Sequence, residues 1–154
     1  MSVRAAAIAV VALVACGKSD KAPAPGSAHA QGSDEATGPV EIGPASSMLG
    51  EALFVKKGCI SCHSIDGSAK IGPSIRGVAA RALGGETRFT DGTAAKDLIG
   101  AGKLFPEVGD YLAAQTLRPR ERVVVGYPPS APAFDDILTK RDMDSLVLYM
   151  QSLD

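Results

Sequence analysis

The residues best suited to chemistry in this chain lie in the run Cys59-Ile60-Ser61-Cys62-His63. Two thiols three positions apart can form two thioether bonds to the vinyl groups of a porphyrin, while the imidazole that follows binds the iron. This spacing is the attachment pattern of c-type haem. The sequence therefore predicts one covalently bound haem c, with Cys59 and Cys62 holding the porphyrin and His63 as an axial ligand of the iron.

A redox-active dithiol and a zinc site are the two other uses of such a cysteine pair. A thioredoxin-like dithiol follows a strand in a βαβ unit, whereas Leu49, Leu53 and Phe54, which precede the pair, have the apolar spacing of a helix. Structural zinc needs four ligands, usually from a second spaced pair, but the remaining cysteine, Cys16, lies in an N-terminal apolar segment. Haem attachment is therefore favoured over both.

The N-terminal segment resembles a bacterial lipoprotein signal. A short positive region is followed by an apolar run over residues 5–14, which is too short to span a bilayer stably. The run ends in Leu-Val-Ala-Cys at Cys16, similar to the lipobox whose cysteine is diacylated and becomes the mature N-terminus. Two acyl chains anchor a protein where one does not. We expect a signal peptide over residues 1–15 and a lipid anchor on Cys16, with an ordinary signal peptide or a buried helix that carries a chance cysteine as the alternatives.

A lipid anchor and a haem c both imply a place outside the cytoplasm, on the periplasmic side of a bacterial membrane or at the cell surface. Residues 16–46 are rich in Ala, Pro, Gly and Ser, with no apolar run able to bury itself, so we expect a disordered tether in which His29 is solvated. A flexible tether of this length has a reach of about 30 Å. Residues 47–154 then form one monohaem domain.

The domain sequence predicts an all-α fold of short helices and long loops. Helices are expected over Ser47–Lys57, Ile75–Leu83, Thr93–Gly100, Glu107–Leu117 and Thr139–Leu153. The one short run of strand composition, Arg122–Val125, is followed by a glycine and two prolines. Because such helices bury little on their own, a central haem is expected to supply the missing apolar volume.

The last of these helices has the clearest pattern. Thr139 and Asp142 form a capping-box start. An apolar stripe follows, made of Met143, Leu146, Val147 and Met150. Tyr149 lies beside the stripe and is expected to cross the first helix near Gly50 and Phe54, where the missing glycine side chain permits close approach.

Further motifs accompany the attachment run: Thr90-Asp-Gly-Thr93, Arg118-Pro119, Val124-Val-Gly-Tyr-Pro-Pro129 and Pro132-Ala-Phe134. Together with the first and last helices, they make the domain resemble a class I c-type cytochrome with a cytochrome c-like fold. The resemblance is closest to the haem-c domain of haem-copper oxidase subunit II. The copper-binding domain that precedes this module in the oxidase is absent from the sequence, so the resemblance implies a stand-alone carrier module on a lipid.

The resemblance also implies roles for single residues. His63 is the proximal iron ligand, and the carbonyl of Pro73 accepts the Nδ1 proton of His63, which leaves Nε2 for iron; a plain turn is the alternative use of Gly72-Pro73. Tyr127 and Phe134 are haem-pocket candidates.

The sixth iron ligand departs from the family pattern. The family normally presents a methionine two positions after the second proline of the Tyr-Pro-Pro loop, but Ala131 occupies that position here. Met143 is a weak candidate, and the other methionines are expected to serve packing. A lysine, a hydroxide or water, an exogenous ligand and an open position stay open as alternatives.

Charge gives no support to nucleic-acid binding, because the formal net charge is −1, from 16 basic and 17 acidic residues. A cationic cluster near the attachment run either steers an acidic redox partner or is a solvated surface. It consists of Lys56, Lys57, Lys70, Arg76 and Arg81.

The expected function is electron transfer in a respiratory chain by a membrane-anchored carrier, not an enzyme, with a terminal oxidase or a quinol-cytochrome c reductase as partner. The alternative is a haem protein that binds small ligands such as CO or NO, or has weak peroxidase-like activity, at a vacant sixth position. Against peroxide chemistry, the loop around Ala131 carries neither a histidine nor an arginine.

Overall fold

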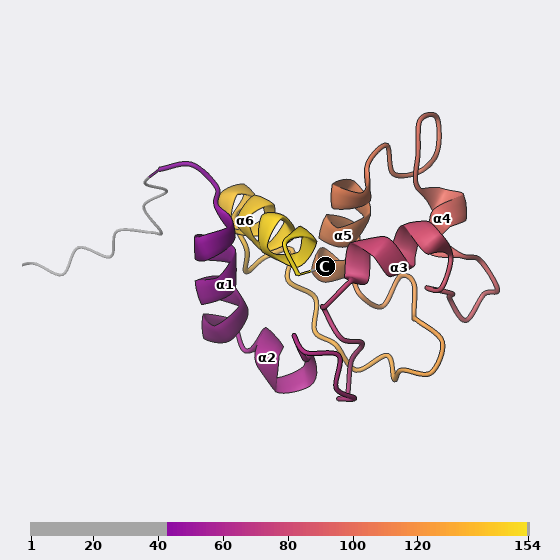
Figure 1. Cartoon of the computed structure of the whole chain (residues 1–154), viewed down its shortest axis with the longest axis horizontal. Helices are drawn as coiled ribbons and strands as arrows, with labels where there is room; N and C mark the ends of the chain where they lie inside the picture. The colour runs from indigo at the N-terminus through magenta and orange to yellow at the C-terminus, as the bar shows by residue number, and fades with distance from the viewer. Residues whose placement is uncertain (1–42, 154) are drawn as a thin grey trace, which may run out of the picture. The chain divides into compact units, whose positions relative to one another are not determined.

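The computed structural model describes residues 43–153, so the predicted signal peptide, Cys16, His29 and nearly all of the predicted tether lie outside the described residues. The described part contains α1 (Ser47–Lys56), α2 (Cys59–Cys62), α3 (Val78–Gly84), α4 (Ala95–Leu98), α5 (Val108–Leu117) and α6 (Lys140–Gln151). Within it there is no β-strand, only three isolated β-bridges, and the all-α prediction is confirmed (Figure 1). No helix in this range has the length and apolarity needed to cross a membrane.

The helix starts follow from capping side chains in the sequence. Ser46 Oγ accepts the amide of Leu49 at 3.2 Å, and α1 begins at the next residue, Ser47. The predicted capping box of α6 is present, because Thr139 Oγ1 accepts the Asp142 amide at 3.1 Å while the Asp142 carboxylate accepts the Thr139 amide at 3.3 Å. The predicted bounds of these two helices are therefore correct to within two residues.

Two other predicted helices are shorter than expected. Instead of starting a helix, the Ile75 amide donates to the Ser64 carbonyl at 2.8 Å, and Gly77 has a φ of 62°, so α3 begins only at Val78. Ala94 and Ile99 each form an isolated bridge, and these bridges confine α4 to the four residues between them. Helix α2 was not expected from the sequence.

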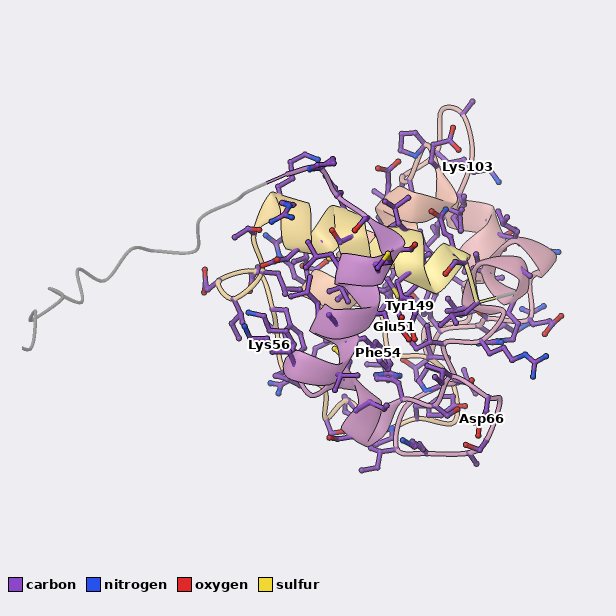
Figure 2. The ribbon with its side chains drawn as sticks, turned by 60° about the vertical axis from the view of Figure 1, so that its left-hand side comes forward. Glu51, Phe54, Lys56, Asp66, Lys103 and Tyr149 are labelled. Atoms are coloured by element: carbon purple, nitrogen blue, oxygen red, sulfur yellow. The ribbon has the colours of Figure 1, made fainter. Side chains whose placement is uncertain are left out.

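The closest helix packing is between α1 and α6, which lie side by side in Figure 1. A Cβ added at Gly50 would lie 2.0 Å from the backbone oxygen of Ser145, so α6 occupies the space that a side chain would need. Phe54 and Tyr149, labelled together in Figure 2, pack with ring centroids 5.7 Å apart. The predicted crossing of the first and last helices is confirmed.

A second group of aromatic side chains comes from α5 and from the loops before and after α4. Tyr111 packs against Phe89 and Phe105, with ring centroids 6.4 and 5.8 Å away. The loop after α5 is joined to this group by backbone hydrogen bonds, from Thr90 to the Val123 carbonyl and from Val125 to the Arg88 carbonyl, both at 2.9 Å. The run of strand composition thus forms only a short local pairing.

Candidate haem site

The two cysteines lie on α2, the four-residue helix that follows α1. Gly58 has a φ of 79°, in the left-handed region that glycine adopts easily, and turns the chain from α1 into α2. His63 then leaves the helix in an extended conformation, with its amide donating to the Cys59 carbonyl at 2.9 Å. Cys59, Cys62 and His63 are half-buried and line one cavity.

The orientation of His63 is set by the Gly72-Pro73 turn. Nδ1 of His63 lies 2.8 Å from the Pro73 carbonyl oxygen. Because a carbonyl oxygen can only accept, Nδ1 donates a proton and the lone pair of the neutral ring lies on Nε2, the atom free to bind a metal. A Cβ at Gly72 would lie 2.4 Å from Cε1 of His63, so only glycine leaves room for this imidazole.

The segment that carries the turn is fixed to the attachment run. The Gly72 amide donates to the Cys62 carbonyl at 2.8 Å, and Nζ of Lys70 donates to the Ile60 carbonyl at 2.5 Å. Ser64, only 3% exposed, donates through Oγ to the Ser68 carbonyl at 2.6 Å. These contacts hold the Pro73 carbonyl in place against the imidazole.

The cavity has a volume of about 690 Å³, within the usual range for cofactor sites. Apolar side chains from four helices and from the loops before α3 and after α5 contribute to its wall, among them Phe54, Ile75, Leu112, Val124 and Leu146. A flat apolar macrocycle that is bonded to two cysteines and bound by His63 requires this combination of donors and apolar wall. The residues present therefore fit a haem c.

The other predicted site residues are placed as follows. Tyr127, Ala131 and Phe134 line the cavity. Met143 is 5% exposed and belongs to the helical core but does not line the cavity, whereas Met150, for which only packing is predicted, does.

The alternatives for the cysteine pair find no support in the described residues. Burial raises the pKa of the Cys59 thiol, opposite to the lowered pKa that activates a thioredoxin-like dithiol. The pair follows helix α1 rather than a strand. Among residues 43–153, no three His, Cys, Asp or Glu side chains are grouped as a metal-binding cluster.

Sequence reasoning missed a polar group in the cavity wall. Tyr111, Arg81 and Arg122 line the cavity together, and Arg122 also lies over the Phe105 ring at 5.5 Å from its centroid. Burial raises the pKa of Tyr111 to about 12, although the charges of Arg122 and Arg81 act to lower it. No local sequence motif predicts this group, because its members lie on α5, on α3 and in a loop.

The predicted cationic cluster is divided by the fold. Lys57 and Arg81 line the cavity, whereas Lys56 is exposed on α1, as Figure 2 shows. The Arg81 guanidinium donates to the carbonyls of Ser74 and Arg76, so part of the cluster serves the loop that holds Pro73.

Comparison with known proteins agrees with this site. The cytochrome c family model matches residues 47–154. Cytochrome c2 of Agrobacterium tumefaciens (strain II Chrys) is 30% identical over 105 residues, which cover 66% of this chain and 86% of that protein. Cytochrome c-551 of Stutzerimonas stutzeri is 43% identical over 49 residues, 32% of this chain and 46% of that protein. The chain belongs to the cytochrome c family, and it is a class I c-type cytochrome with one covalently bound haem c that transfers electrons between redox partners.

Proposed function

We propose that this cytochrome is a lipid-anchored carrier in a bacterial respiratory chain, held outside the cytoplasm by Cys16. Cys59 and Cys62 would hold the haem covalently, and His63 would bind its iron. The observation that carries the electron-carrier part of the proposal is the 2.8 Å contact between His63 Nδ1 and the Pro73 carbonyl, within a cavity that the cysteines also line. The anchor is supported by the lipobox-like sequence that ends at Cys16. When bound, the haem supplies a one-electron couple at its iron.

The rest of the domain orients the cofactor and excludes water from it. The Pro73 carbonyl fixes the tautomer of His63, and an acceptor on Nδ1 raises the basicity of the ligand nitrogen. Tyr127 and Phe134 cover part of the cavity wall. None of these groups makes or breaks a covalent bond during electron transfer, so the protein needs no catalytic residue.

The partner is a membrane redox complex, either a quinol-cytochrome c reductase as donor or a terminal oxidase as acceptor. The resemblance to the haem-c domain of haem-copper oxidase subunit II supports an oxidase partner. Lys57, which lines the cavity, and Lys56, exposed nearby on α1, support docking to an acidic surface. Association should then slow as ionic strength rises.

The anchor and the carrier function are tested with one pair of proteins. Wild type and Cys16→Ser are produced in a bacterial host that attaches haem c, and the cells are separated into membrane and soluble fractions. We expect a haem-stained band in the membranes for wild type and in the soluble fraction for Cys16→Ser, with equal haem content. Both purified proteins should accept one electron per haem. If Cys16→Ser stays in the membranes, the lipid anchor is refuted. If wild type shows no covalent haem stain, the electron-carrier function is refuted.

A further inference from the structure

Besides His63, the cavity offers few side chains of the kinds that bind haem iron. Iron in haem proteins is held by His, Met, Tyr or Cys side chains. Apart from His63 and the two attachment cysteines, the described lining residues of these types are Tyr111, Tyr127 and Met150, and Lys57 adds an amine. The contacts of these residues decide whether any of them can be a second ligand.

Met150 is held by packing. It lies in the last turn of α6, is 6% exposed and belongs to the same apolar core as Phe54 and Tyr149. A thioether in such a position fills space between helices. If the Met150 side chain moved to bind the iron, it would leave a cavity in the core. The other two methionines in the described range are more remote, since Met143 does not line the cavity and Met48 is 81% exposed.

The lysine and the tyrosines are also poor candidates. Nζ of Lys57 is already engaged, because it donates to the Ile137 carbonyl at 3.3 Å. A tyrosine binds iron as a phenolate, whose negative charge favours ferric over ferrous iron. For Tyr111, burial raises the pKa to about 12, which makes the phenolate still harder to form.

The loop over residues 127–132 lines the same cavity without a nitrogen or sulfur donor in its side chains. Three prolines restrict its backbone. Nε of Arg120 donates to the Ala131 carbonyl at 2.9 Å and fixes the loop at that point. Arg120, which lies outside the loop in the sequence, is thus placed against it by the fold. Its Nε is already bonded to the Ala131 carbonyl.

We propose that, among residues 43–153, His63 is the only strong ligand for the haem iron and that the bound haem would therefore take up a neutral diatomic ligand, carbon monoxide or nitric oxide. The proposal rests on the haem site proposed above. Carbon monoxide forms one bond by donating the lone pair of its carbon to ferrous iron, and no electron or proton is transferred. The side chains of Pro128, Pro129 and Ala131 give this loop an apolar surface suited to a neutral ligand, although Arg81 and Arg122 elsewhere in the cavity wall are cationic.

The test is a titration of the reduced full-length protein with carbon monoxide, followed by the Soret absorbance. We expect saturable binding by wild type. Ala131→Met introduces a thioether into the loop and should lower the carbon monoxide affinity at least about tenfold, or 1.4 kcal/mol, while raising the reduction potential. Met150→Leu and its matched control Met143→Leu, on the same helix but away from the cavity, should both bind like wild type.

Other outcomes would overturn the inference. Absence of binding by wild type, or an affinity at least about tenfold higher in Met150→Leu or Lys57→Ala, would mean that an internal ligand occupies the iron. If the protein carries covalent haem and takes up one electron but does not bind carbon monoxide, this inference fails and the carrier function stands. If no covalent haem is present, the proposed function itself fails. Wild type and Met150→Leu decide the question even if Ala131→Met does not fold.

Discussion

The α1–α6 pair and the loop over residues 119–138 are stabilised in different ways. The helix pair is in direct contact, because Gly50 allows α6 to approach the α1 backbone and the Phe54 and Tyr149 rings pack together. The loop instead places residues such as Val124 and Phe134 at the wall of a large cavity. The helix pair therefore buries much of its apolar surface against protein, although Phe54, Leu146 and Met150 also line the cavity, whereas the loop depends on the haem for the same purpose.

Removal of the haem should give the largest effect and should separate the two regions. In a Cys59→Ala/Cys62→Ala double variant the haem cannot be bonded, and the cavity of about 690 Å³ loses its covalently held occupant. We expect more than about 5 kcal/mol of stability to be lost, enough to abolish cooperative unfolding. Hydrogen exchange should show fast amides over residues 119–138 and slower amides in α1 and α6.

The control for this variant is Cys16→Ser, which removes the third cysteine and should keep both the haem and the exchange pattern. The contrast between the two regions would be wrong if residues 119–138 stayed as protected in the double variant as in the haem-containing protein.

Gly50→Ala should give the next largest effect and should act on the helix pair. The new methyl group would lie 2.0 Å from the Ser145 oxygen and 2.7 Å from Cβ of Tyr149, so the two helices must separate. We expect a loss of about 3 kcal/mol in the free energy of unfolding, measured with guanidinium chloride on the haem-containing protein.

Gly109→Ala on α5 is the matched control. Its methyl group would lie 3.3 Å from Cγ1 of Val147, a side-chain atom that can move. The higher helix propensity of alanine, worth about 1 kcal/mol, should offset this contact and leave stability nearly unchanged. Equal losses for the two variants would contradict the assignment of Gly50 to a backbone contact.

Local sequence patterns predicted the parts of the site and fold that depend on near neighbours. The Cys59–His63 spacing indicated the haem, and Thr139 with Asp142 gave the start of α6. The proximity of Gly50 to α6 was predictable because the absence of a side chain is visible in the sequence.

Features that depend on long-range contacts were not predictable. Ile75 belongs to an apolar run of helical type, yet its amide is bonded to Ser64, and α3 starts later for that reason. The Tyr111 group was missed because Arg81 and Arg122 are far apart in the sequence and come together only around the cavity. The attachment helix α2 has four residues, too few for a periodic pattern.

The smallest of the three effects is a pH dependence that reports on the cavity wall. Burial raises the pKa of Tyr111 from 10.0 to about 12 in the folded protein. At pH values between these two, the unfolded chain loses the phenolic proton while the folded protein keeps it, so rising pH favours unfolding. The contribution is fully present below pH 10 and is lost as the pH rises to about 12, and its size is about 2 to 3 kcal/mol.

The measurement is the guanidinium unfolding of the haem-containing protein at several pH values between 9 and about 12. Tyr111→Phe keeps the aromatic packing against Phe89 and Phe105 but has no proton to lose, so its stability should fall less steeply than that of wild type. Equal slopes would mean that the phenol is in contact with water in the haem-containing protein. The cavity wall near α5 would then be as open as the loop, and the buried region would be limited to the side formed by α1 and α6.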